Sequence, residues 1–153
     1  MIRCKWCNLK NEKYIEYHDK EWCKSNFEDK YLFEMLILES FQAGLSWITI
    51  LHKREAFKEA FDQFDVNKIA MYDDCKINKL MNNPKIIRNS RKIKAAVKNA
   101  QIFIEIQKEY GSFSKYLWAY TNDKIIYEKK ENKTTSTLSD QISKDLKKKA
   151  CHL

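Results

Sequence analysis

Glycine and proline are scarce in this chain: Gly44, Gly111 and Pro84 are the only ones among 153 residues. A fold of many strands needs such residues at short intervals, because tight turns require a positive or a fixed φ. The scarcity disfavours β-sandwiches and β-barrels and predicts an all-α fold. Apolar residues make up 44% of the chain and aromatic residues 13%, which is too many for a disordered segment.

The length of the chain is that of one domain. No repeat or Gly/Ser-rich linker divides it, so we expect a single domain over 1–153: an irregular segment over 1–27, a helical body over 28–149 and an atypical tail over 150–153. The apolar runs are too short to cross a bilayer, and the first residues lack a signal-peptide core. We therefore expect a cytoplasmic protein without membrane contact, whose five cysteines are thiols or metal ligands rather than disulfides.

Hydrophobic spacing and capping residues predict the helices of the body. The predicted segments are Asp29–Ala43, Trp47–Phe61, two short helices capped by Asp65 and by Asp73 or Asp74, a long helix that ends at Gly111, 112–120, and Gln141–Lys149 capped by Ser139. We expect residues 121–138 to form a loop with room for a short hairpin.

Glu39 stands in the middle of the most apolar stretch of the chain. On a helix, Leu32, Met35, Leu36 and Ala43 share its face, so the carboxylate is expected on the stripe that faces the core. Burying an ionised carboxylate is costly unless it is paired or hydrogen-bonded. Such a residue is therefore neutral, partnered inside the fold, or kept for chemistry.

Aromatic residues are placed to surround this acid. Gly44 interrupts the helix and lets it restart at Trp47, which brings an indole beside Glu39. Tyr14, Tyr17 and Trp22 are further candidates for an aromatic box, which binds flat or cationic rings by stacking and cation–π contacts. Aromatic residues of a small domain also build ordinary cores, and the neighbouring carboxylate is what favours a ligand pocket.

The positive charge lies in the second half of the chain. Residues 1–80 hold 13 Lys/Arg and 14 Asp/Glu, a balance of −1, whereas residues 81–153 hold 16 and 7, a balance of +9, and together they give +8. A strongly basic half is typical of proteins that bind a polyanion, most often nucleic acid. A lysine-rich solvated surface explains the same counts equally well.

The helices predicted on either side of 82–89 are typical of a helix–hairpin–helix. In that motif, backbone N–H groups at the start of the second helix face a DNA phosphate. An ordinary packing corner gives the same pattern, and the usual hairpin glycine is absent. The cations expected around the phosphate are Arg88, Arg91, Lys92, Lys94 and Lys98.

The N-terminal segment holds candidate zinc ligands. Cys4, Cys7, His18 and Cys23 carry the sulfur and nitrogen atoms that zinc prefers in tetrahedral sites, and the first two have knuckle spacing. Isolated cysteines are more often small buried apolar groups. No second close pair completes a recognised site, so both interpretations stay open.

Several stretches together resemble the 3-methyladenine DNA glycosylase I family, and the resemblance covers residues 1–149. The most specific is Leu32-Phe33-Glu34-Met35-x-x-Leu38-Glu39-x-x-Gln42-Ala43-Gly44-Leu45-Ser46-Trp47-Ile48-Thr49. The others are Arg3-Cys4-x-Trp6, Tyr14-Ile15-x-Tyr17-His18-Asp19-x-Glu21-Trp22, Lys53-Arg54-Glu55, Ile86-Ile87-Arg88, Lys92-Ile93, Asn99-Ala100 and Ser139-Asp140.

The resemblance implies an all-helical helix–hairpin–helix enzyme that flips 3-methyladenine out of DNA and hydrolyses its N-glycosidic bond. Alkylated DNA is the implied partner, zinc is the implied structural metal, and we expect a monomer. By matching position, Glu39 is the implied catalytic residue. The remaining implied site residues are Tyr17 and Trp47 in the base pocket with Trp6, Tyr14 and Trp22 around them, and Cys4 and His18 as two of four zinc ligands.

The sequence departs from the family at its end. The family continues past the last lysine-rich helix with a closing segment that holds the other two zinc ligands, and Cys151 and His152 do not align with these. The departure predicts weak or substoichiometric zinc binding, marginal stability and little glycosylase activity. It leaves two alternatives open: a truncated, inactive fragment, and a small zinc-dependent nucleic-acid-binding module.

Overall fold

The computed structural model describes residues 3–127 and 135–149. Within these ranges the chain is all-α, as predicted, with eight α-helices, one short 3₁₀-helix and no strand. The helices are α1 (Glu12–Lys20), α2 (Asp29–Gln42), α3 (Trp47–Ala60), η1 (Asp62–Phe64), α4 (Val66–Ala70), α5 (Asp74–Met81), α6 (Ser90–Tyr110), α7 (Phe113–Ala119) and α8 (Thr137–Lys148).

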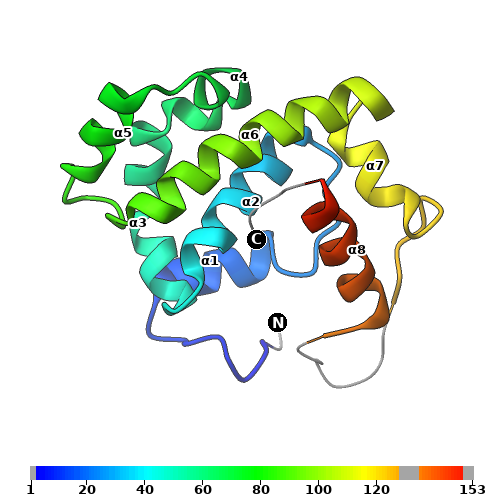
Figure 1. Cartoon of the computed structure of the whole chain (residues 1–153). Coiled ribbons are helices and arrows are strands. Elements are labelled where there is room, and N and C mark those ends of the chain that lie inside the picture. Colours follow the sequence, from blue (N-terminus) through cyan, green and yellow to red (C-terminus); the bar gives the residue numbers. More distant parts are fainter. Residues whose placement is uncertain (1–2, 128–134, 150–153) are drawn as a thin grey trace.

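The long helix α6 runs diagonally across the molecule, and the other helices are arranged around it (Figure 1). Helix α5 packs on α6 at one end and α7 at the other, while α4 packs nearer the middle, where Gln101 donates to the carbonyl of Ala70. Helix α2 also packs against α6, and α3 joins α2 to α1. This arrangement brings α1, the end of α2 and the start of α3 into one region.

The core face of α2 is not the one that the sequence pattern predicts. Phe33, Ile37, Leu38 and Phe41 are almost completely buried, whereas Glu39 is exposed. The predicted stripe was wrong because α2 is apolar on nearly every side, so two different faces satisfy the helical spacing. Glu39 therefore lies outside the core.

The helix ends are largely those predicted from capping residues. The side chains of Asp65 and Asp73 accept backbone N–H bonds at the starts of α4 and α5. Gly111 ends α6 in the left-handed conformation, with φ of 84°. The predicted cap of the last helix was wrong, because Ser136 is the cap and Ser139 is its partner in a capping box.

The N-terminal segment is more ordered than predicted. Helix α1 begins after Asn11, whose side chain accepts the N–H of Tyr14, so 1–27 is not irregular throughout. Residues 121–127 of the predicted loop contain no strand, and residues 128–134 lie outside the described residues, as does the tail at 150–153. The loop is shorter than predicted, because α8 already begins at Thr137. The single-domain division stays a prediction. None of the helices in the described ranges has the length and apolar character needed to cross a membrane.

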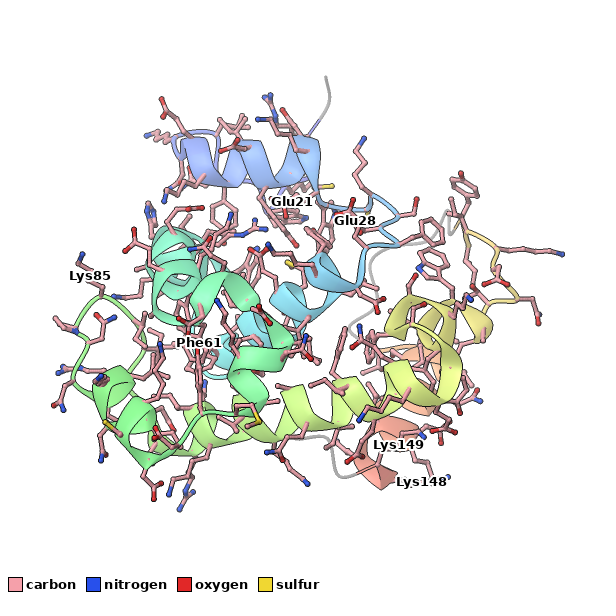
Figure 2. All side chains as sticks on the ribbon, turned by 90° about the horizontal axis from the view of Figure 1, so that it is seen from above. Glu21, Glu28, Phe61, Lys85, Lys148 and Lys149 are labelled. Carbon is pink, nitrogen blue, oxygen red and sulfur yellow. The ribbon has the colours of Figure 1, made fainter. Side chains whose placement is uncertain are left out.

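Basic residues of the second half lie at both ends of the molecule. Figure 2 places Lys85, in the connection between α5 and α6, at one end of the molecule, and Lys148 and Lys149 at the other. Lys149 forms an ion pair with Glu109 at 2.7 Å and lies over the ring of Tyr110. The hairpin end and the α8 end are therefore separate basic regions.

Candidate active site

The six residues predicted for the base pocket line one cavity of about 280 Å³, together with Gln42. Helices α1 and α2, the segments flanking α1 and the first residue of α3 each contribute. The fold thus brings together side chains that are far apart in sequence. The lining residues are Trp6, Tyr14, Tyr17, Trp22, Glu39, Gln42 and Trp47.

Ring contacts hold the aromatic walls in place. The Trp6 ring lies edge-on to Trp22 with centroids 5.0 Å apart, and edge-on to Tyr14 at 5.7 Å. Tyr17 contacts Trp47 in the same way at 5.4 Å. Edge-to-face pairs at such distances are favourable beyond the area they bury. The cavity is therefore a preformed aromatic box.

Glu39 supplies the charge in this box. Its side chain is reached by solvent, yet the walls displace part of its hydration, and this desolvation raises the pKa of its carboxyl. The buried Tyr17 has its pKa raised to about 12, first by desolvation and then by the charge of Glu39. Near neutral pH the phenol therefore keeps its proton and offers an O–H donor beside a carboxylate acceptor.

Two indole N–H groups of the box have no partner. Trp6 Nε1 and Trp47 Nε1 are the buried side-chain nitrogen or oxygen atoms within 3–127 and 135–149 that accept or donate no hydrogen bond. An unsatisfied buried donor costs about 1–3 kcal/mol. Both unsatisfied N–H groups belong to residues of the aromatic box, so the free-energy penalty is concentrated in this region. This favours a wall shaped for a ligand over a core optimised for stability.

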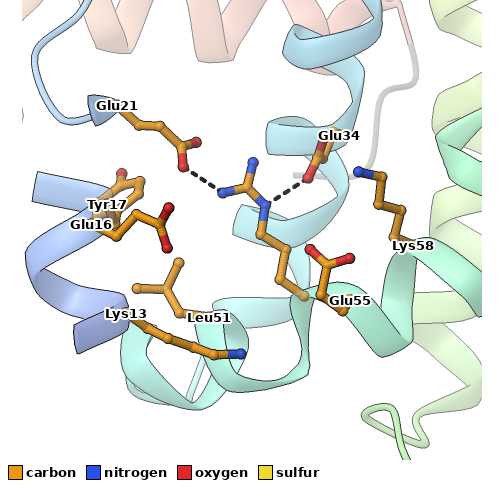
Figure 3. Close-up of a pocket in the computed structure, with 9 residues that line it drawn as sticks. Lys13, Glu16, Tyr17, Glu21, Glu34, Leu51, Glu55 and Lys58 are labelled. Atoms are coloured by element: carbon orange, nitrogen blue, oxygen red, sulfur yellow. Dashed lines mark hydrogen bonds and ion pairs between the residues drawn. The ribbon is translucent and has the colours of Figure 1, made fainter. Parts of the chain in front are cut away.

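A second cavity, of about 380 Å³, lies behind Tyr17 and is polar (Figure 3). In it, the Arg54 guanidinium of α3 donates to Glu34 of α2 and to Glu21 at the end of α1, each at 2.7 Å. Burial alone would lower the pKa of Arg54, but the two carboxylates outweigh it and raise that pKa. The helical spacing of α3 does not reveal these contacts of Arg54, because both partners lie at least 20 residues away in sequence.

The connection over 82–89 presents cations to solvent. Ile86 is buried beneath it, and Arg88 and Arg91 are exposed. Asn89 caps α6 by accepting the N–H of Lys92. Eight residues, 82–89, join α5 to α6, and the exposed Asn89, Ser90 and Arg91 leave the start of α6 open to a ligand. Lys94 and Lys98, which follow on α6, are also exposed.

Lys92 is placed differently from its basic neighbours. Its ammonium donates to the carbonyl of Phe41 at 2.8 Å and to that of Ala43 at 2.6 Å, at the end of α2. The sequence-based expectation grouped Lys92 with the cations that face a phosphate. In the structure its charge is held by backbone carbonyls more than 45 residues away in sequence.

The predicted zinc ligands do not form a complete site within the described residues. His18 interacts through Nδ1 with Asp19 at 2.9 Å and accepts the backbone N–H of Cys4 at Nε2. Cys7 is buried, which matches an apolar thiol, and Cys23 is exposed. No group of three or more metal-binding side chains occurs in 3–127 and 135–149. Two ligands do not fit a four-coordinate structural zinc, and Cys151 and His152 lie outside the described residues.

Comparison with known proteins decides the family. The family model described as methyladenine glycosylase matches residues 6–153, almost the whole chain. The chain belongs to this family. It is therefore a glycosylase, a hydrolase of N-glycosyl bonds in DNA repair.

Named relatives and solved structures agree with this assignment. The chain is 42% identical over 151 residues to the DNA-3-methyladenine glycosylase of Haemophilus influenzae, covering 96% of this chain and 81% of that protein. It is 37% identical to DNA-3-methyladenine glycosylase 1 of Escherichia coli, covering 97% and 81%.

Two solved structures are similar in fold as well as in sequence. The 3-methyladenine DNA glycosylase I of Staphylococcus aureus superposes with a TM-score of 0.90 at 41% identity, covering 94% of this chain and 78% of that one. A variant of a 3-methyladenine DNA glycosylase I, solved in complex with 3-methyladenine, also gives 0.90 at 40% identity, covering 97% and 82%.

Proposed function

We propose that this chain removes 3-methyladenine from DNA by hydrolysing the bond between the base and its deoxyribose. The observation that carries the proposal is the aromatic box with one carboxylate, Glu39, at its mouth. Its volume of about 280 Å³ lies just below the range of about 300–1,000 Å³ of drug-sized ligand pockets. A cavity of that size suits a single base better than a whole nucleotide.

The chemistry of the box matches an alkylated purine. A base alkylated in the nucleotide carries a positive charge, which the faces of Trp6, Tyr14 and Trp47 attract by cation–π contact. Glu39 accepts hydrogen bonds from the N–H edge of the base and is attracted by the same charge. Unmodified adenine offers no positive charge, so the box discriminates against it.

The reaction itself needs little from the protein beyond this recognition. The alkylated base is a good leaving group because its departure neutralises its charge. The enzyme extracts the nucleotide from the stack, holds the base and lets water attack C1′. Glu39 is the residue that we propose contacts the reacting base, and no general base is assigned.

DNA is held at the hairpin end. The start of α6 offers free backbone N–H groups and a favourable helix dipole to a phosphate. Arg88 and Arg91 are exposed beside it. The α8 lysines lie at the other end of the molecule (Figure 2) and are not part of this proposed contact.

Release of free base from methylated DNA tests the proposal. The purified chain is expected to release 3-methyladenine, detected by chromatography, and to leave adenine in untreated DNA; the departure at the end of the sequence predicts that the release is slow. Glu39→Gln is expected to slow the release, because the amide replaces part of the acceptor edge by a donor. No release by the chain, or equal release of unmodified adenine, would contradict the proposal.

We keep structural zinc as a separate prediction. Cys4 and His18 are neighbours, and two protein ligands seldom hold this ion. Elemental analysis is expected to give less than one zinc per chain, and a chelator is expected to leave the melting temperature unchanged. One tightly held zinc per chain would show the expectation to be wrong. Cytoplasmic location and a monomeric state also stay predictions, the second tested by sedimentation.

A further inference from the structure

The turn that joins α2 to α3 lies between the residues of the aromatic box. Glu39 and Gln42 line the cavity just before this turn, and Trp47 lines it just after. Gly44 takes a φ of 81° within it, a conformation that other residues rarely adopt. Any displacement of residues 43–46 therefore moves the carboxylate and the indole relative to each other.

Local bonds hold this turn only in part. The N–H of Leu45 donates to the carbonyl of Gln42 at 2.7 Å, and the Gln42 side chain donates back to the carbonyl of Leu45 at 2.9 Å. Helix α2 has no basic residue in its own last turn to complement the negative end of its dipole. The charge that stabilises the end of α2 comes instead from α6.

Lys92 supplies that charge. Its ammonium is bonded to the carbonyls of Phe41 and Ala43, so it satisfies carbonyls that the helix end leaves without an intrahelical partner. The next residue, Ile93, is fully buried in the core, as is Phe41. The first turn of α6 is thus anchored to the end of α2 by apolar packing and by one charged group.

The same turn of α6 also carries part of the proposed phosphate contact. Arg91 precedes Lys92 and is exposed, and Arg88 lies just before the cap. Two neighbouring basic residues therefore have different surroundings: one is open to a phosphate, and the other is bound to backbone carbonyls beside the box. A single helical turn connects the proposed phosphate contact to the base-binding residues.

We propose that Lys92 is a positioning residue that fixes the turn 43–46 against α6. The distance between the proposed phosphate contact at the hairpin and the residues of the aromatic box is thereby kept constant. The proposal rests on the proposed function. Its physical basis is that binding energy from phosphates accelerates the reaction only when the reacting base is held in the correct geometry. Lys92 transmits the position of α6 to Glu39 and Trp47 without contacting DNA or the base.

Lys92→Met tests the proposal, because methionine keeps much of the aliphatic stem and removes the ammonium. The single-turnover rate on saturating methylated DNA is expected to fall about 10- to 100-fold, as for a misplaced reacting group. The slope of log K for DNA binding against the logarithm of the salt concentration is expected to equal that of the unsubstituted chain. Lys92→Arg, which keeps charge and donors, is expected to restore part of the rate.

Two matched variants on the same helix separate positioning from phosphate contact. Arg91→Gln is expected to lower the salt slope by about 1, as for one lost phosphate contact. Lys108→Met, an exposed lysine farther along α6, is expected to change neither rate nor slope. If Lys92→Met lowers the salt slope of DNA binding and leaves the single-turnover rate on saturating DNA unchanged, the proposal is overturned. It is also overturned if Lys92→Met changes neither the slope nor the rate.

Amide exchange provides a readout that does not depend on activity. The amides of Leu45 and Thr49, which donate to the carbonyls of Gln42 and Ser46, are expected to exchange faster in Lys92→Met, whereas amides in the middle of α6 are not. If the unsubstituted chain releases no base, the proposed function fails, and unchanged exchange at the turn would overturn the positioning role separately. Should Lys92→Met not fold, Lys92→Gln carries the same comparison.

Discussion

The base pocket holds its one carboxylate within aromatic walls, whereas the hairpin presents Arg88 and Arg91 to open solvent. Desolvation shifts the pKa of the pocket carboxylate. The exposed arginines keep their hydration and act through a field that salt screens. Under the proposed function, the pocket selects one base by contact, and the hairpin attracts any DNA regardless of sequence.

The two regions also differ in how they are supported. Behind the pocket, Arg54 joins Glu21 at the end of α1 to Glu34 of α2, and the Tyr31 hydroxyl donates to Glu21 at 2.9 Å. At the hairpin, the buried Ile86 and the cap residue Asn89 hold the backbone. Removing a side chain of the network behind the pocket should therefore lower the free energy of unfolding. Removing an exposed arginine of the hairpin should instead lower the salt-dependent affinity for DNA.

The largest effect is expected from Arg54→Met. It leaves Glu21 and Glu34 partly buried without their counter-ion, and breaking a buried ion pair by removing one partner costs about 3–5 kcal/mol. Denaturation by urea measures the change in the free energy of unfolding. Lys20→Met is the matched control, because its pair with Glu16 is exposed and should contribute little. Equal stability of the two variants would show that the pocket does not depend on this network.

Neutralising the hairpin is expected to act on DNA affinity alone. Replacing Arg88 and Arg91 by Gln should weaken binding similarly for all sequences and flatten the plot of log K against log salt by about 1–2 units. Affinity for free 3-methyladenine should not change, because neither residue lines the pocket. If the slope stays the same, the connection over 82–89 is a packing corner rather than the phosphate site.

A smaller effect should appear in the pH dependence of base binding. The ionised form of Glu39 is the acceptor, and desolvation raises the pKa of its carboxyl above that of an ordinary glutamate. Lowering the pH therefore protonates Glu39 earlier than an ordinary glutamate, and affinity falls as the pH drops through this raised pKa. Glu39→Gln has no carboxyl that titrates at this position. The difference between the affinities of the unsubstituted chain and of Glu39→Gln for the base should therefore become smaller as the pH is lowered. A constant difference down to the ordinary pKa of glutamate would contradict the shift.

Sequence reasoning located most helices because their capping residues act locally, as Asp65, Asp73 and Gly111 show. It failed for the orientation of α2, since an almost uniformly apolar helix has no distinct polar face. It missed α1, a short helix in which Tyr17 is the buried residue. In each case, contacts with other helices decide which side of the helix faces the core, and the spacing of apolar residues in the sequence does not reveal those contacts.

The site was predictable as a set of residues and not as an arrangement. A carboxylate beside Trp47 and the resemblance to a family identified the lining residues. Gln42 was missed, although it lies one turn after Glu39 and so shares its face. The roles of Arg54 and Lys92 depend on partners 20 to 51 residues away, and neither residue type nor spacing indicates such contacts.

Titration of free 3-methyladenine into the chain and into Glu39→Gln, followed by tryptophan fluorescence, tests the central claim most directly. We predict that the unsubstituted chain binds the free base through the N–H edge that faces Glu39, a contact that needs no charge on the base. Glu39→Gln should weaken the binding by about 1–3 kcal/mol, because a donor then faces the N–H edge of the base, while the melting temperature is retained. Equal affinity of both chains for the base, or a lower melting temperature without a specific loss of binding, would contradict the account.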